Sequence, residues 1–225
     1  MNEQKHFRRE QMSETIWVNL LLAFSGGFQD AYTYIVRDHV FANAQTGNIV
    51  LLSMNFMQGE WQAGFRYLLP VLAFAAGVFI AENIQHYFKN AHALHWRQGV
   101  LLIEIFIMIA VGFMPQSMNL VANIMISFAC AMQIQSFRKV RGNPYASTMC
   151  IGNLRSGTAA FAGWLRQRNG NDREKMLDYF GEILVFAIGA GLGGSLSGLL
   201  AERTIWISAA VLVVSFALME NWVAD

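Results

Sequence analysis

The sequence predicts an all-α, polytopic helical membrane protein, and three observations predict this class. Of its 225 residues, 55% are hydrophobic and only 14% are charged, and the charged residues lie mainly between long apolar runs. Six of these runs approach the roughly 20 residues that a helix needs to cross hydrocarbon. Lipid offers no partner for unpaired backbone groups, so the runs should be helices. We therefore expect one membrane domain at 15–225, preceded by a short cytoplasmic tail at 1–14.

The six expected spans and two shorter runs follow one another along the chain. We expect transmembrane helices at Ile16–Val36, 67–88, 99–114, 119–137, 179–201 and 204–222. Two further apolar runs, 41–57 and 148–165, are short or interrupted, and each holds a polar, glycine-containing step near its start. Each of these two runs could either cross the membrane or dip into it.

The positions of Lys and Arg bear on that choice, because cytoplasmic loops of membrane proteins carry an excess of both. If neither short run crosses, the N-terminus, 89–98 and 138–178 face the cytoplasm and hold 13 of the 16 basic residues. If both cross, the inside holds 8 and the outside 7, which is no bias. We therefore favour six spans with both termini cytoplasmic, and we expect 41–57 and 148–165 to be re-entrant or broken helical segments.

The two halves of the chain also echo one another. Asp30, Gly47 and Asn48 correspond to Gln135, Gly152 and Asn153 at a constant offset of 105 residues. Farther on, the pattern Leu-x-Phe-Ala-x-Gly recurs at 72–77 and 184–189. We interpret this as a duplication, with repeat one at about 15–114 and repeat two at about 119–222. Three spans per half would place the repeats in opposite orientations, which is a recurring transporter design.

At the same positions the chain resembles a known family. The first matching stretch is Gly26-Gly27-Phe28-Gln29-Asp30-Ala31-Tyr32 followed by Val40-Phe41-Ala42-Asn43-Ala44-Gln45-Thr46-Gly47-Asn48. The second is Met132-Gln133-Ile134-Gln135-Ser136-Phe137-Arg138, then Ser147-Thr148 and Gly152-Asn153-Leu154, with Ile151 where a Thr commonly precedes the glycine. These stretches resemble the DUF1275, or YoaK-like, family of bacterial multi-pass membrane proteins of uncharacterised function. The resemblance implies a multi-pass architecture and the bacterial inner membrane, and it implies no activity.

Asp30 is the first candidate functional residue. An ionisable group at the bilayer centre costs roughly 2.5–3.5 kcal/mol, so it usually faces a protein interior or a water-filled path. Asp30 could bind a cation or carry a proton, with Gln29 completing a polar lining. The alternative is a structural carboxylate, hydrogen-bonded to the start of a broken helix.

Three glutamates lie in or beside the expected spans. Glu104 lies in the middle of an apolar run and must find a partner on another helix or stay protonated, so we place it with Asp30 on a candidate ion path. Glu82 and Glu182 lie toward the expected helix ends, where we favour a solvated or interfacial position.

Thr46, Gly47 and Asn48 open the first short run with a hydroxyl, a flexible step and an amide. At a helix N-terminus, free N–H groups and the helix dipole favour an anion, so these residues could contact a small polar or anionic solute. Thr and Asn are also ordinary capping residues, so a purely structural role stays open.

Gly152 and Asn153 open the second short run and invite the same two interpretations. Arg155, one turn further on, could hold an anionic group or extend to the cytoplasmic surface. Gln135 is the better interior candidate of two neighbouring glutamines, because it is the repeat mate of Asp30.

Several other patterns point away from familiar sites. The stretch 189–194 matches GxGxxG, but no strand precedes it, and its small residues at spacing four instead predict close helix packing. Cys130 and Cys150 should be free thiols. No metal, cofactor or catalytic motif stands out, and a net charge of +1 argues against a nucleic-acid surface.

These observations predict a secondary transporter or small permease of the bacterial inner membrane, not an enzyme. Its solute would be small and polar or anionic, and transport would be coupled to a proton or another cation. The alternative is a non-transporting scaffold or sensor whose polar motifs are structural, and a third possibility is an intramembrane enzyme acting on lipid. Its partners would be the lipid bilayer and a solute or ion, and a homodimer is compatible with the small chain.

Overall fold

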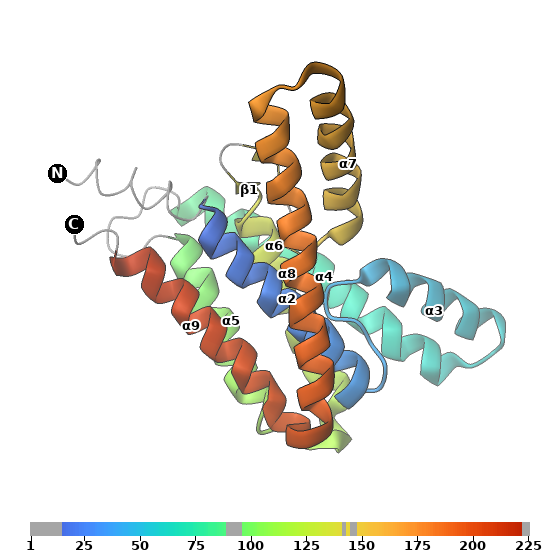
Figure 1. The fold of residues 1–225 in the computed structure, drawn as a ribbon. Coiled ribbons are helices and arrows are strands. Elements are labelled where there is room, and N and C mark those ends of the chain that lie inside the picture. The colour runs from blue at the N-terminus through green and yellow to red at the C-terminus, as the bar shows by residue number, and fades with distance from the viewer. Residues whose placement is uncertain (1–14, 89–95, 141–142, 145–147, 222–225) are drawn as a thin grey trace.

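The computed structural model describes residues 15–88, 96–140, 143–144 and 148–221, and this part of the chain is almost entirely helical (Figure 1). Its helices are α2 (Ile16–Val36), α3 (Gln45–Met57), α4 (Trp61–Phe88), α5 (Trp96–Val111), η1 (Gln116–Met118), α6 (Asn119–Ser136), α7 (Cys150–Gln167), α8 (Gly170–Leu200), η2 (Ala201–Thr204) and α9 (Ile205–Asn221). Two-residue strands, β1 (Lys139–Val140) and β2 (Asn143–Pro144), pair antiparallel. The all-α prediction is confirmed, and the expected tail 1–14 lies outside the described residues.

Every expected run holds a helix, but three of the helices begin earlier than predicted, and α4 and α8 do so by the most. α4 begins at Trp61 and α8 at Gly170, about two turns before the apolar runs do. The Asn169 side chain caps α8 by accepting a hydrogen bond from the Asn171 N–H at 3.0 Å. Hydropathy marks only the apolar part of a helix, so these polar first turns were missed.

Three segments of the described chain are long and apolar enough to cross a membrane. They are Trp61–Phe88, Gln116–Ser136 and Gly170–Met219, and the last contains both α8 and α9. Length and composition therefore agree with a helical membrane protein.

Helices from the first half of the chain pack against helices from the second half. α2 runs along α8, and α4 runs along α6. α2 and α8 are parallel, since Gly189 lies at the Phe24 carbonyl and Gly193 at the Phe28 carbonyl. α4 and α6 are also parallel, since Gly77 lies at Phe128 and farther on the two helices join through Glu82 and Gln135. The predicted close packing is confirmed at Gly189 and Gly193, but at Gly198, where the same spacing predicted it, a Cβ would enter open space.

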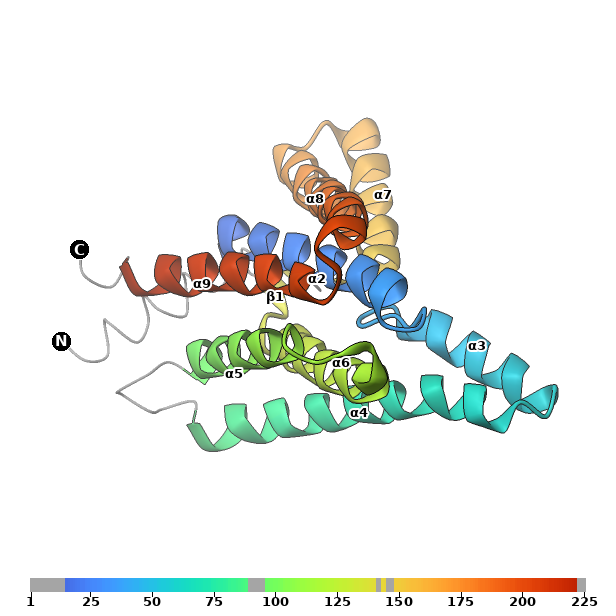
Figure 2. The same cartoon turned by 90° about the horizontal axis from the view of Figure 1, so that it is seen from below.

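α2 and α6, the first long helices of the two halves, run in opposite directions. The Asn123 Nδ2 near the start of α6 donates to the Arg37 carbonyl just after α2, at 2.6 Å. Farther along, the Cys130 thiol of α6 donates to Gln29 of α2. α3 packs on α4 and α7 packs on α8, and the two hairpins project from the bundle in different directions (Figures 1 and 2).

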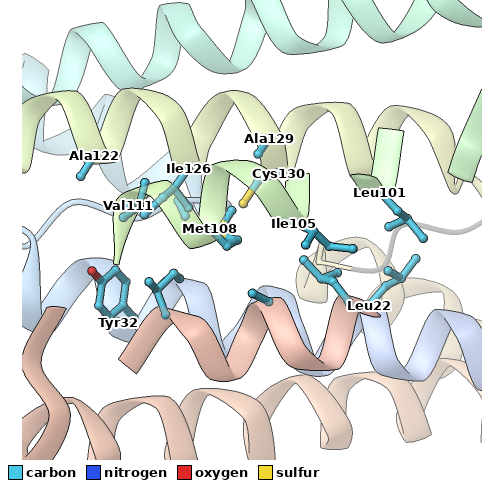
Figure 3. Packing of buried hydrophobic residues seen from close by; sticks show 14 of the residues in the cluster. Leu22, Tyr32, Leu101, Ile105, Met108, Val111, Ala122, Ile126, Ala129 and Cys130 are labelled. Atoms are coloured by element: carbon cyan, nitrogen blue, oxygen red, sulfur yellow. The ribbon is translucent and has the colours of Figure 1, made fainter. Parts of the chain in front are cut away.

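The main hydrophobic core lies between α2, α5, α6 and α9 (Figure 3). This cluster includes Leu22 and Tyr32 from α2, Leu101 and Met108 from α5, and Ile126 from α6. Each of these side chains is fully buried. This core fixes α2, which carries the residues of the candidate site.

Candidate functional site

The loop between α2 and α3 folds back along the helix that it leaves. The Asn43 N–H donates to Asp30 Oδ1 at 2.7 Å, and the Asn43 side-chain amide donates to the Gly26 carbonyl at 3.1 Å. Asp30 is 6% exposed. The loop therefore returns to the middle of α2, and Asp30 holds the residues that lead into α3. This geometry agrees with the structural alternative for Asp30.

Asn48 locks the same loop from the other side. Its Oδ1 accepts from the Phe41 N–H at 3.0 Å, and its Nδ2 donates to the Phe41 carbonyl at 2.7 Å. The Phe41 ring lies against Gly47, where a side chain would crowd it. Asn48 is fully buried, so both ends of its amide serve the fold. Of the polar step predicted here, Thr46 alone is exposed.

The segment leading into α7 reaches the same point on α2. Thr148, two residues before α7, packs against Gly26 of α2, so that any side chain at Gly26 would collide with the Thr148 methyl group. Asn43 approaches Gly26 as well. The starts of α3 and α7, which belong to different halves of the chain, therefore converge on one turn of α2.

A cavity of about 970 Å³ opens at this convergence, and we name it the central cavity. Its polar lining includes Asp30, Tyr34 and Ser195 together with residues at the starts of α3 and α7: Asn43, Gln45, Thr46 and Thr148. The rest of the lining is largely apolar and includes Ala31, Ile35, Phe41, Phe74, Ile151 and Phe186. Of the described residues that line it, Asp30 is the only one with a carboxyl group, and none is basic.

Two polar atoms at the central cavity have no hydrogen-bond partner within the described chain. They are Asn43 Oδ1 and Thr148 Oγ1, and both residues are more than nine-tenths buried. Buried acceptors are normally satisfied by protein or by water, so each such atom needs an explanation. A ligand that donates hydrogen bonds would provide one.

A second polar cluster lies inside the bundle, between α2, α5, α6 and α9. Gln29 Nε2 lies 3.1 Å from Glu104 Oε1, 2.9 Å from Ser25 Oγ and 3.0 Å from Ser208 Oγ. The Cys130 thiol donates to Gln29 Oε1 on the other side of the amide. All five side chains are buried. Gln29 and Glu104 were both predicted for the ion path but not as a pair, and the structure joins them, with Gln29 as the interhelical partner that Glu104 required.

Arg37 is the largest fully buried polar side chain in the described chain. Its Nε donates to the Tyr32 hydroxyl at 2.9 Å and its Nη1 to Asn119 Oδ1 at 2.9 Å. The remaining donors reach the carbonyls that follow the end of α5: Val111, Met114 and Pro115. Arg37 thus satisfies carbonyls that a helix end leaves unpaired.

Two predictions about glutamine and glutamate positions are wrong. Gln135 is half-buried and pairs with Glu82 at the surface, whereas Gln133 is 1% exposed. Glu182 is also 1% exposed, and its carboxylate has no hydrogen-bond partner within the described chain. It is not at a helix end, because α8 begins at Gly170 and so extends three turns before it.

The remaining predicted residues lie on α7 but outside the central cavity. Asn153 is buried on the first turn of α7, while Gly152 and Arg155 are exposed. Arg155 is therefore not brought to the cavity, and the exposed position agrees with its alternative as a surface residue. Cys130 and Cys150 are free, as expected, and Cys150 lines the cavity.

The sequence did not single out the residues that form the convergence. Asn43 and Thr148 lie at an offset of 105, the same offset that relates Asn48 to Asn153, and could have been found by extending that comparison. Ser25 and Ser208 gave no signal, because single serines in apolar helices are common.

Comparison with known proteins identifies the family and nothing more specific. A family model described as "Protein of unknown function (DUF1275)" matches residues 18–218. No curated protein and no solved structure matches the chain. Because the match covers nearly the whole chain, the protein belongs to this family.

Proposed function

We propose that this member of the DUF1275 family is a permease of the bacterial inner membrane, a secondary transporter whose solute site is the central cavity. One observation carries the proposal: the starts of α3 and α7 meet a buried carboxylate, Asp30, at a cavity between the two halves of the chain. Interrupted helices that begin at a midplane site between repeats are typical of such transporters.

The chain would cross the membrane six times, by α2, α4, α5, α6, α8 and α9, with both termini in the cytoplasm. The cross-packing of α2 with α8 and of α6 with α4 supports two inverted repeats, as does the antiparallel arrangement of α2 and α6. The two-fold relation would exchange α3 with α7 and place their starts at the same depth.

α3 would then enter the membrane without crossing it. It begins beside Asp30, near the middle of α2, and has 13 residues. At 1.5 Å per residue it is about 20 Å long, enough to run from the midplane to one surface of a hydrocarbon core about 30 Å thick. α7 would do the same toward the opposite surface.

Asp30 would couple solute movement to a proton or another cation. An ionised carboxylate accepts a stronger hydrogen bond from the Asn43 N–H than a protonated one does. The protonation state of Asp30 would therefore change how strongly the segment before α3 is held against α2. The buried network around Gln29 and Glu104 joins α2 to α5, α6 and α9 and would keep α2 rigid while the entry moves.

The test is gradient-driven flux in proteoliposomes. Purified protein is reconstituted with a pH-sensitive dye inside, a pH gradient is imposed, and cationic, neutral and anionic solutes are added in turn. We expect at least one solute to dissipate the gradient with the wild type and with Asp38→Asn, whose carboxylate bonds to Asn119 instead, but not with Asp30→Asn. The absence of solute-dependent flux in folded protein would refute the permease.

A scaffold or sensor is the second candidate, because several polar side chains serve the backbone. Asp30 holds Asn43, Asn48 holds Phe41, and Arg37 holds the end of α5. Under this alternative Asp30→Asn lowers the thermal stability of the detergent-solubilised protein, and the wild type shows no flux for the variant to lose.

A further inference from the structure

Three polar residues that line the central cavity lie at or near Gly26, and each of them can accept a hydrogen bond. A Cβ atom on Gly26 would lie 3.2 Å from Thr148 Cβ and 3.7 Å from Asn43 Nδ2, so both residues lie on the same side of α2. Asp30 lies one turn farther along α2 and bonds to the backbone of Asn43. A carboxylate, an amide and a hydroxyl therefore meet in one place.

The orientation of the Asn43 amide is determined by its partner. Its Nδ2 faces the Gly26 carbonyl, which can only accept a hydrogen bond. Asn43 Oδ1 must therefore face away from Gly26, and it has no partner in the described chain, like Thr148 Oγ1. Asn43 Oδ1 and the carboxylate can only accept, and the Thr148 hydroxyl can accept as well as donate, so a positively charged donor fits all three groups.

The other walls of the central cavity indicate what the rest of the ligand should be, apart from its charged group. Its walls include Ile35, Phe74 and Phe186, and the Tyr34 and Phe41 rings lie stacked with centroids 4.9 Å apart. A volume of about 970 Å³ is at the upper end of small-molecule sites, far larger than a metal ion needs. Apolar and aromatic walls favour an apolar chain, and aromatic faces also attract cations.

We infer that the central cavity binds a protonated primary amine with an apolar body, its ammonium held by Asp30, Asn43 Oδ1 and Thr148 Oγ1. The inference rests on the proposed solute site, and it replaces the small polar or anionic solute expected from the sequence with an amphipathic cation. An anion finds no basic residue among the described lining. The Asn43 N–H before α3, which could otherwise bind an anion, already donates to the Asp30 carboxylate.

Cys150 provides a built-in reporter of occupancy. It lines the central cavity and is half-buried, whereas Cys130 is 1% exposed. Protein in nanodiscs of zwitterionic lipid is treated with a small maleimide, and the alkylation rate of Cys150 is followed by mass spectrometry. The probes are octylammonium, octanol and octanoate, which share a chain and differ in the head group. Cys150→Ser serves as the blank.

We expect octylammonium to slow alkylation of Cys150 at concentrations at least about tenfold below those of octanol or octanoate. Equal protection by all three would show that only the apolar walls bind, and stronger protection by octanoate would show an anion site. Either result, or no protection by octylammonium, would overturn the inference.

Two variants test the head-group contacts. Thr148→Val keeps the shape and the methyl contact with Gly26 but removes the hydroxyl, and should raise the protecting concentration of octylammonium about tenfold. Asp30→Asn should raise it further, while Asp38→Asn, which lies outside the central cavity, should leave it unchanged. An unaltered response in both Asp30→Asn and Thr148→Val would refute the assigned contacts.

The protection of Cys150 tests the amine site and the flux in proteoliposomes tests the permease, so either proposal can fail while the other holds. If octylammonium protects Cys150 but no solute moves in proteoliposomes, the site stands and the permease does not. If another solute moves in a manner that depends on Asp30 while octylammonium gives no protection, the permease stands and the amine does not.

Discussion

The Cys130 thiol donates to Gln29 Oε1, and this bond determines that the nitrogen of the amide faces Glu104. Without the thiol, Oε1 is a buried acceptor with no donor, which costs about 1–3 kcal/mol. We expect Cys130→Ala to lower the unfolding free energy by that amount and Cys130→Ser, which restores a donor, to lower it less. Thermal unfolding in detergent measures both, with Cys150→Ala as the matched control outside the network. Equal stability of the two alanine variants would contradict the role of Cys130.

Arg37 should be the basic residue whose loss costs the most stability among those in the described chain. Its guanidinium is fully buried and donates to five groups, two of them the side chains of Tyr32 and Asn119. Arg37→Gln keeps a polar side chain but leaves most of these acceptors unpaired, and we expect a loss of about 3–5 kcal/mol. The matched control is Arg203→Gln, because Arg203 is exposed. Comparable melting temperatures for the two variants would show that Arg37 does not hold the end of α5.

The apolar runs predicted the helices, because burial in lipid and in the core both require apolar side chains. α2 was placed at its observed bounds, since charged residues follow the run at Arg37 and Asp38. α8 was shortened, because its first turns carry Asp172, Arg173 and Lys175 and continue as helix without being apolar. Hydropathy therefore indicates which part of a helix is apolar, but it does not indicate where the helix begins and ends.

The site was predicted less completely, because the repeat offset is not constant through the fold. An offset of 105 relates the starts of α3 and α7, but α2 ends at Val36 and α6 at Ser136. Asp30 therefore lies nearly two turns before the end of its helix, whereas Gln135 is in the last turn. The loop after α6 is longer, so Gln135 is not the structural counterpart of Asp30. Only the path of the loops could reveal this.

Gly189 and Gly198 make a matched pair for testing the packing of α2 on α8. A Cβ on Gly189 would collide with the Phe24 carbonyl, while a Cβ on Gly198 would enter open space. In a helix Ala is favoured over Gly by roughly 0.5–1 kcal/mol. We expect Gly198→Ala to raise or maintain the melting temperature and Gly189→Ala to lower it, since backbone cannot move aside as a side chain does. A stable Gly189→Ala protein would mean that α2 and α8 separate easily.

The orientation of the α3–α4 turn discriminates between six and eight spans. Gly59 lies in this turn, but its φ of +79° strains any other residue, so the cysteine belongs at the exposed Glu60. In a background of Cys130→Ser and Cys150→Ser, intact cells are treated with a membrane-impermeant thiol reagent. We expect Glu60→Cys to be labelled from outside, because α3 enters from the outer side and returns to it.

Two controls fix the meaning of that result. In both the six-span and the eight-span topologies, Arg203→Cys would face outward and Asn171→Cys would face the cytoplasm. Labelling of Glu60→Cys together with Arg203→Cys supports inverted repeats with α3 as a re-entrant helix. Labelling of Glu60→Cys only after the membrane is opened, together with Asn171→Cys, would mean that α3 crosses. The halves would then be parallel repeats of four spans each, which would contradict the antiparallel arrangement of α2 and α6.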